Sequence, residues 1–356
     1  MYEQDVRHTK SLADPTAPPI GLGVADASGG VTTRGLGKQF GDLWALRDLD
    51  LDVAPGTILG LLGHNGAGKT TAIRILTTLS APTTGSATVA GHDVVRDADA
   101  VRASIGVASQ QATVDGLMSA RKNLVMVGRL YHLTPKAAKQ RADALHEALD
   151  LSDAADQLVK TFSGGMRRRL DLAASLIAAP AVLFLDEPTT GLDPRSRGDL
   201  WDMLRVLVRN GTTAVLTTQY LDEADQLADD IAVLDHGRTV AHGTPADLKS
   251  QVGTDRVDVT VSSVSDLAMV ARATERFAAS PPTLDDATCV ATVPIIDGTR
   301  LVDVMRALDA EGIDPVDLNR RQASLDDVFL ILTGERPAPD EPTDAESVEG
   351  NQEASR

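Results

Sequence analysis

The chain has 356 residues, 42% of them hydrophobic, and its 34 basic and 51 acidic side chains leave a formal net charge of -17. This length is enough for about two domains of roughly 150 residues. The acidic balance excludes a broad nucleic-acid-binding face, because neutralising phosphates requires clustered Lys and Arg, but it leaves room for a local anion site. With Cys289 as the single cysteine, an intrachain disulfide and a cysteine metal cage are excluded, which is typical of a reducing compartment.

We expect both ends of the chain to be disordered tails. Residues 1–30 contain several prolines and glycines and no continuous apolar segment of the kind found in signal peptides, and residues 336–356 contain almost nothing apolar. The longest nearly apolar stretch, residues 176–185, is far below the roughly 20 residues that a membrane-spanning helix needs. The sequence therefore predicts a chain with no transmembrane segment of its own.

Between the tails, the pattern changes near residue 250. In residues 31–250, short apolar segments bounded by polar or turn residues alternate with longer amphipathic segments. Apolar segments of this length are typical of strands buried on both faces of a mostly parallel sheet, and the alternation predicts an α/β fold. The expected strands are residues 57–62, 181–185, 213–217 and 231–234, and the expected helices include residues 135–149 and 195–209.

We expect residues 251–335 to form a small α+β domain. Valine alternates strictly at positions 257, 259 and 261, as in a strand with one buried face, and a helical stripe follows at Leu301, Met305 and Leu308. Residues 324–327 fit a capping box that opens a last short helix. Three roles remain open for this domain, namely dimer stabilisation, permease docking and regulatory ligand binding, of which we favour assembly.

The most informative segment is a match to the phosphate-binding pattern G-x-x-x-x-G-K-[ST]. It follows an expected strand and precedes a segment, residues 71–79, that can form a helix, as the pattern requires. Glycines let successive backbone N–H groups converge on phosphate oxygens at the start of a helix. The Lys neutralises the β and γ phosphates and the Thr hydroxyl is placed to ligate Mg²⁺; the alternative is a chance glycine-rich turn. The matched residues are Gly63, His64, Asn65, Gly66, Ala67, Gly68, Lys69 and Thr70, and Thr71 follows them.

A nucleoside triphosphate site also needs a carboxylate for magnesium at the end of a neighbouring strand. The expected strand at residues 181–185 is followed directly by Asp186 and Glu187. We assign Asp186 to magnesium and Glu187 to orienting or deprotonating the attacking water. Taken alone, such an acid pair is equally well explained as a solvated turn.

The segment Phe162-Ser163-Gly164-Gly165-Met166, just ahead of this strand, resembles the LSGGQ signature of the ATP-binding subunits of ABC transporters. The resemblance covers residues 31–250 and implies a P-loop core with a helical subdomain at about residues 118–158. In the family, the signature (here Ser163, Gly164 and Gly165) contacts the γ phosphate of ATP held by the other subunit. The resemblance therefore implies ATP and Mg²⁺ as cofactors, a homodimer, an integral membrane permease as partner, and a peripheral position on the cytoplasmic face of the membrane.

Four further positions are similar to functional residues of that family. Phe40 resembles the aromatic residue that stacks on adenine. Gln110 resembles the glutamine that reaches magnesium and water, although the adjacent Gln111 fits nearly as well. Asp193 belongs to a segment that resembles the loop coupling the two sites of the dimer. Gln219 stands where the family normally has a switch histidine, and since glutamine can donate a hydrogen bond but cannot shuttle a proton, we expect a slow ATPase.

Within the family, the chain is most similar to subunits that energise export of daunorubicin-type antibiotics. Three features support this: Gln219 itself, the run of residues 217–225 around it, and the C-terminal residues 324–334. Two alternatives remain. One is an ABC ATPase that acts on ribosomes or DNA, although the paired cassettes, coiled-coil insertion and zinc cysteines of such proteins are missing from this sequence. The other is a regulatory ATP binder with little hydrolysis.

Overall fold

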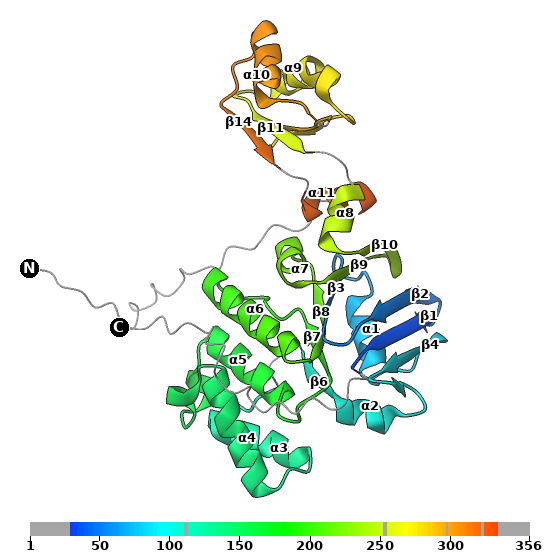
Figure 1. The fold of residues 1–356 in the computed structure, drawn as a ribbon, viewed down its shortest axis with the longest axis vertical. Coiled ribbons are helices and arrows are strands. Elements are labelled where there is room, and N and C mark those ends of the chain that lie inside the picture. Colours follow the sequence, from blue (N-terminus) through cyan, green and yellow to red (C-terminus); the bar gives the residue numbers. More distant parts are fainter. Residues whose placement is uncertain (1–28, 110–112, 252–254, 297, 322–323, 334–356) are drawn as a thin grey trace, which may run out of the picture.

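The computed structural model describes residues 29–109, 113–251, 255–296, 298–321 and 324–333 (Figure 1). The expected C-terminal tail lies wholly outside these described residues, as does the N-terminal tail apart from Gly29 and Gly30, and so do Gln110 and Gln111. None of the helices within the described ranges is long and apolar enough to cross a membrane.

A six-stranded sheet runs through the main body of the protein. Its strand order is β10-β9-β3-β8-β7-β6, and every neighbouring pair is parallel except the hairpin of β9 and β10. All residues of β3 and β8 are buried, as expected for central strands covered on both faces. The predicted α/β core is therefore confirmed, with strands β3 (Ile58–Leu62), β6 (Ile105–Ala108), β7 (Val182–Asp186), β8 (Thr213–Thr218), β9 (Asp230–Asp235) and β10 (Arg238–Gly243).

A second, antiparallel sheet lies beside the parallel one. Its order is β2-β1-β4-β5, and the sequence patterns did not predict it. Its apolar side chains share one core with helix α1 and with one face of the parallel sheet. The strands are β1 (Val31–Phe40), β2 (Leu43–Val53), β4 (Thr84–Val89) and β5 (His92–Asp93), and the helices on this side are α1 (Lys69–Leu76) and α2 (Ala98–Ser104).

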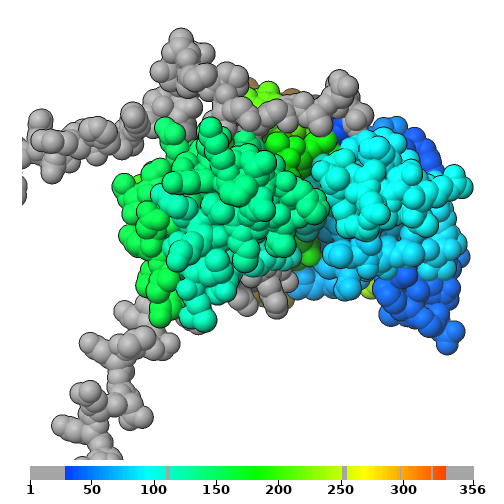
Figure 2. Space-filling model, turned by 90° about the horizontal axis from the view of Figure 1, so that it is seen from below, coloured from blue at the N-terminus to red at the C-terminus, as the bar shows by residue number. Residues whose placement is uncertain are grey.

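Helices cover the other face of the parallel sheet and extend beyond it. Their apolar faces meet strands β7 and β8 in a separate core, and Figure 2 shows the resulting helical lobe, in green, beside the blue and cyan lobe of the antiparallel strands and α2. The expected helices at 135–149 and 195–209 are confirmed to within a residue at each end. The elements are α3 (Ala120–Leu130), α4 (Pro135–Ala148), α5 (Gly164–Ser175) and α6 (Pro194–Arg209), with short 3₁₀ turns at Ser152–Ala154 and Val159–Thr161.

The C-terminal segment forms a small domain with its own core, seen at the top of Figure 1. Val257, Val259 and Val261 are buried, as their alternation predicts. The helical stripe is wrong at one position, because Met305 is 36% exposed and Val304 takes its place in the core. The sheet has the order β12-β13-β11-β14, with β11 (Arg256–Thr260), β12 (Thr283–Asp285), β13 (Val290–Pro294), β14 (Asp317–Arg321), α9 (Val264–Thr274), a 3₁₀ turn (Glu275–Phe277) and α10 (Leu301–Ala310).

The last helix, α11 (Leu325–Thr333), returns to the cassette formed by residues 31–250. Its buried residues pack with α7 (Leu221–Leu227), α8 (Pro245–Gln251) and strands β3 and β9, and Figure 1 shows it beside α8. The capping box is confirmed: Ser324 Oγ accepts from Asp327 N at 3.3 Å, and Ser324 N donates to Asp327 Oδ2 at 3.0 Å. The expected domain boundary at residue 251 assigns α11 to the small domain, whereas the apolar face of α11 packs against the cassette.

Candidate nucleotide site

The phosphate-binding pattern folds into a loop between β3 and α1. Gly66 and Gly68 have φ angles of 89° and 108°, which side chains other than glycine rarely adopt. A Cβ at Gly68 would stand 2.7 Å from the backbone oxygen of Ala45 on β2. The glycine at this position therefore lets α1 begin at Lys69, two residues earlier than expected, and the helix ends at Leu76 because Thr78 turns to a left-handed φ of 63°.

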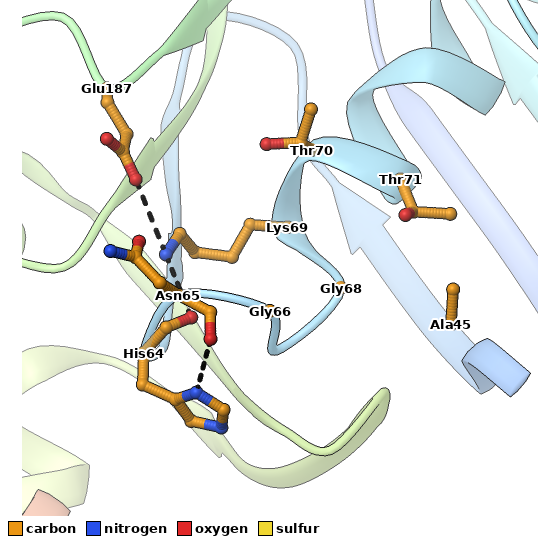
Figure 3. A pocket seen from close by; sticks show the side chains of 9 residues that line it. All are labelled: Ala45, His64, Asn65, Gly66, Gly68, Lys69, Thr70, Thr71 and Glu187. Carbon is orange, nitrogen blue, oxygen red and sulfur yellow. Dashed lines mark hydrogen bonds and ion pairs between the residues drawn. The ribbon is translucent and has the colours of Figure 1, made fainter. Parts of the chain in front are cut away.

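The Lys69 side chain bridges the loop and the carboxylates after β7. It is 4% exposed. Its ammonium donates to Gly63 O at 2.6 Å and to His64 O at 3.2 Å, and lies 3.6 Å from Glu187 Oε1. Figure 3 shows the Lys69 side chain directed toward Glu187. Burial lowers the pKa of Lys69, an effect that the charges of Glu187 and Asp186 oppose. The loop thus holds a cation in place for an anionic ligand.

Asp186 and Glu187 lie where the sequence predicts, at the carboxyl end of β7. Thr70 Oγ1 donates to Asp186 Oδ1 at 3.3 Å, and Thr217 on the neighbouring β8 donates to the same oxygen at 2.6 Å. The backbone of Glu187 is left-handed, with φ at 48°, and its N–H donates to Thr217 Oγ1 at 3.0 Å. The two hydroxyls and Asp186 form a compact set of oxygens, the ligand type that Mg²⁺ prefers.

An open pocket lies over this loop (Figure 3). Its lining comprises seven residues of the loop and the start of α1, together with Glu187 from the end of β7 and Ala45 from β2. The structure therefore brings seven of the nine predicted phosphate-binding residues, all but Gly63 and Ala67, and the predicted water-activating carboxylate around one cavity. The lining residues are Ala45, His64, Asn65, Gly66, Gly68, Lys69, Thr70, Thr71 and Glu187.

Two further predicted residues, Phe40 and Gln219, do not line the pocket. Phe40 is at the tip of the β1–β2 hairpin that also carries Ala45; its side chain is 55% exposed, and Lys38 Nζ lies 5.1 Å from the ring centroid. Gln219 follows the end of β8 and is partly exposed. Because β8 lies between β3 and β7, Gln219 is at the same edge of the sheet as the phosphate loop and Asp186.

The predicted signature lies outside this pocket. Ser163 caps α5, its Oγ accepting from Met166 N at 3.2 Å, and both Ser163 and Gly164 are exposed. Asp193 caps α6 through Ser196, whose hydroxyl and N–H lower the pKa of Asp193. A Cβ at Gly165 would stand 2.8 Å from Ser196 Oγ, so the caps of α5 and α6 adjoin one another.

Several known proteins resemble this chain in sequence and in fold. A family profile described as ABC transporter matches residues 46–190. The chain is 52% identical over 307 residues to the daunorubicin resistance ATP-binding protein DrrA2 of Streptomyces coeruleorubidus, which covers 86% of this chain and 95% of that protein. This chain belongs to the family of ABC transporter ATP-binding proteins. It is an ATPase subunit of the P-loop class, as the sequence predicts.

Two other relatives and two solved structures complete this picture of an ABC ATP-binding protein. The chain is 46% identical to the daunorubicin/doxorubicin resistance protein DrrA of Streptomyces peucetius, over 88% of this chain and 95% of the relative. It is 39% identical to the Nod factor export ATP-binding protein I of Cupriavidus pinatubonensis, over 89% and 95%. An ATP-binding subunit of an ABC transporter superposes with a TM-score of 0.57 at 24% identity, over 63% of this chain and 93% of that one. A dimeric post-hydrolysis cassette bound to ADP and Pi gives 0.55 at 22%, over 60% and 98%, so both share the fold.

The sequence of this ABC ATP-binding protein did not single out Arg168, which connects the signature helix to two other segments. The partly buried Arg168, on the signature helix α5, donates from Nη1 to Ser109 O at 2.6 Å and from Nε to Pro188 O at 2.7 Å, and its Nη2 lies 3.3 Å from Glu187 O. One turn along, the buried Asp171 accepts from Thr113 N at 2.8 Å. The signature helix therefore holds both described ends of the segment around Gln110 and the backbone after Asp186. The run of three arginines offered a signal, but not which of them turns inward.

A second missed residue of the ABC ATP-binding protein is Glu223 on α7, four positions after Gln219. It is 1% exposed, and burial raises its pKa, against the effect of nearby hydroxyls and of Trp201. Trp201 Nε1 on α6 donates to Glu223 Oε1 at 3.4 Å. Glu223 therefore ties the helix after Gln219 to the helix that Asp193 caps. The sequence does not distinguish Glu223 from its acidic neighbours Asp222 and Asp225, because solvated and buried acids look alike in sequence.

Proposed function

We propose that this ABC ATP-binding protein energises export of a hydrophobic drug of the daunorubicin type, as a Mg²⁺-dependent homodimer attached to a separate membrane permease at its cytoplasmic face. The observation that carries the proposal is the 52% identity to a daunorubicin resistance protein, which extends over 95% of that protein's length. A daunorubicin/doxorubicin resistance protein is 46% identical, and a doxorubicin resistance protein is 43% identical. The likeness thus reaches well beyond the 145 or so residues that the family profile matches.

The residues around the pocket fit the chemistry of ATP hydrolysis. Lys69 is held 2.6 Å from a loop carbonyl and would turn from it to the β and γ phosphates of ATP. Thr70 and Asp186 would hold Mg²⁺, which neutralises charge on the phosphates. Glu187 orients the attacking water and takes its proton. Gln219 can only donate a hydrogen bond to the γ phosphate, so the general-base work falls on Glu187 and turnover is slow.

The position of the predicted signature supports the proposed homodimer. Ser163 and Gly164 are exposed at the start of α5 and do not line the pocket of their own chain. A second copy can therefore offer its signature to ATP bound here, so that binding draws two chains together and hydrolysis releases them. Phe40, at the tip of its hairpin, is accessible for stacking on adenine.

The assignment of Glu187 is tested by the Glu187→Gln variant. We expect it to bind ATP with wild-type affinity and to lose most phosphate release. Phe40→Ala provides a contrasting variant, in which ATP affinity falls while the rate at saturating ATP changes little. If Glu187→Gln hydrolysed ATP as fast as the wild type, Glu187 would not be the base.

The transport role is tested by isolating the full chain from solubilised membranes of its native host. We expect co-purification with a polytopic membrane protein, and ATPase activity of that complex that rises with daunorubicin. Stimulation by a Nod factor instead would favour the export class named in the 39% identical relative. Co-sedimentation with ribosomes, without a membrane partner, would refute the transport role, and ATP binding without phosphate release would indicate a regulatory subunit.

A further inference from the structure

A cluster of metal-ligating side chains lies beside the phosphate loop, apart from the carboxylates after β7. It consists of His64 in the loop, Asp235 at the end of β9, and His236 in the turn to β10. One potential ligand atom from each lies within 4.8 Å of the others. In Figure 3 the ring of His64 points away from Lys69, Thr70 and Glu187.

The hydrogen bonds of His64 determine what its second ring nitrogen can do. Nδ1 lies 2.7 Å from the backbone oxygen of Asn65, and because a carbonyl only accepts, Nδ1 carries a hydrogen. In a neutral imidazole, Nε2 is then a bare acceptor. It faces Asp235 Oδ1, also an acceptor, at 3.0 Å. Two acceptors this close need a cation between them, which is either a proton on Nε2 or a metal ion.

The same geometry is typical of histidines that bind metals. Such a histidine usually donates its other ring N–H to a carbonyl or carboxylate, which fixes the tautomer and directs the bare nitrogen at the ion. Zn²⁺ takes tetrahedral ligands at about 2.0–2.2 Å, so two of its ligands stand roughly 3.3–3.6 Å apart. The 3.0 Å between His64 Nε2 and Asp235 Oδ1 is slightly shorter, so the two side chains separate a little when the ion enters.

His236 provides the third ligand. Its Nε2 is 3.8 Å from Asp235 Oδ1, and its ring centroid is 5.3 Å from that of His64. The His236 side chain is 81% exposed, so a small ring rotation brings the nitrogen to the shared ion without disturbing the core. Two imidazoles and one carboxylate are a known ligand set for Zn²⁺, with the fourth position left to water.

The backbone beneath the cluster is already fixed. Gly237, next to His236, donates from N to Ala67 O in the phosphate loop at 3.0 Å, and its carbonyl accepts from Arg47 N at 2.7 Å. The turn carrying Asp235 and His236 is thus bonded to the loop carrying His64. Ligands held on a rigid frame lose little freedom when an ion binds.

We propose that His64, Asp235 and His236 form a binding site for a divalent transition-metal ion of the Zn²⁺ class, which links the β9–β10 turn to the phosphate loop. The proposal does not rest on the transport role, and the site shares no ligand with the proposed Mg²⁺ site, although His64 also lines the nucleotide pocket. Because the ion binds the folded chain through residues from two separate elements, it raises the stability of the fold with increasing metal concentration.

The test uses the full chain without a polyhistidine tag or nucleotide, titrated calorimetrically with ZnCl₂ in excess MgCl₂. We expect saturable binding of one Zn²⁺ per chain and a melting temperature that rises with Zn²⁺. Replacing Zn²⁺ with Co²⁺ should give the visible absorption bands of a low-symmetry nitrogen and oxygen site.

His236→Ala is the informative variant, since the ring it removes is mostly exposed; we expect it to lose the saturable Zn²⁺ binding and the thermal shift. His242→Ala is the matched control, because His242 belongs to the same hairpin and pairs with Asp230 at 2.7 Å, but belongs to no three-ligand cluster found among the described residues. It should bind Zn²⁺ as the wild type does. The proposal is overturned if the wild type shows no saturable binding, which would leave a proton between His64 and Asp235, or if His236→Ala binds Zn²⁺ unchanged.

Discussion

Thr217 makes hydrogen bonds to both acidic residues of the nucleotide site. Its hydroxyl donates to Asp186 at 2.6 Å and accepts from the N–H of Glu187 at 3.0 Å. The register of β7 and β8 pairs Thr217 directly with Asp186. The sequence places Thr217 only at the end of an expected strand. Its function depends on which strand lies next to it, and that pairing is not a local property of the chain.

Thr217→Val keeps the shape of this buried side chain and removes the hydroxyl. We expect a higher Mg²⁺ concentration for half-maximal ATPase activity and a lower maximal rate, because Asp186 and Glu187 lose a shared support. The loss of stability should be about 2–3 kcal/mol, because the variant loses two hydrogen bonds, one of them to a carboxylate. ATPase rates measured against Mg²⁺ concentration test this. Thr213→Val is the control, because Thr213 is buried in the same strand but accepts from Gly56, so a shift in its Mg²⁺ dependence would contradict the argument.

Glu223 gives the fold a pH-dependent stability. Its pKa is raised by burial above the ordinary value of 4.5. As the pH rises past 4.5, the unfolded chain releases this proton while the folded chain keeps it, so the free energy of unfolding falls until the pH exceeds the folded-state pKa. Glu223→Gln removes that fall, and we expect the variant to gain stability over the wild type as the pH rises from 4.5 to 8.

Urea unfolding over that pH range measures the difference. Glu147→Gln serves as the control, because Glu147 is exposed on α4. The free energy of unfolding of this variant should follow that of the wild type over the whole pH range. Parallel curves for Glu223→Gln and wild type would show that Glu223 ionises as readily in the folded chain as in the unfolded one.

At the scale of elements, the sequence predicted what each segment forms better than where it packs. Strands such as β3 and β8 are buried on both faces, so their apolar composition identifies them. The antiparallel sheet escaped prediction because the burial of β1 and β2 is irregular and their register shifts at several points. The capping box of α11 was predictable, since it is local. The packing of α11 on the cassette was not predictable, because an apolar helix face can pack against the core of either domain.

Phe329→Ala tests to which unit α11 belongs. Phe329 is 4% exposed within the core shared by α7, α8 and β9, and truncating such a side chain costs about 3–5 kcal/mol. Both tryptophans, Trp44 on β2 and Trp201 on α6, lie in the cassette, so tryptophan fluorescence reports cassette unfolding. We expect this transition to move to lower denaturant.

The control for α11 is Ile331→Ala, because Ile331 lies on the same helix but is 59% exposed. Its effect should stay within about 0.5 kcal/mol. A tryptophan transition unaffected by Phe329→Ala would place α11 with the small domain, as the division at residue 251 implies.

At the scale of the whole molecule, the pocket and the predicted signature lie apart within one chain. Lys69 and Glu187 line the pocket, while Ser163 is exposed at the start of α5. If two chains pair with two-fold symmetry, the pocket of one faces the signature of the other, and both sites are equivalent. A substitution in the phosphate loop then damages the site of its own chain, whereas a substitution in the signature damages the site of the other chain.

This arrangement predicts complementation between two inactive variants. Lys69→Ala alone and Ser163→Arg alone inactivate both sites of their homodimers. In a mixed dimer, one site receives both defects and the other receives neither, because its loop and its signature come from the unaltered parts of the two chains. Half of the chains mixed at equal concentration enter such dimers with one intact site each, so activity should recover to about a quarter of the wild-type value. Steady-state ATPase assays of the mixture measure this, with Lys69→Ala mixed with Glu187→Gln as the control, because both of those defects lie in the pocket half and every site stays damaged. A mixture of Lys69→Ala and Ser163→Arg no more active than the control would mean that the signature does not act across a dimer.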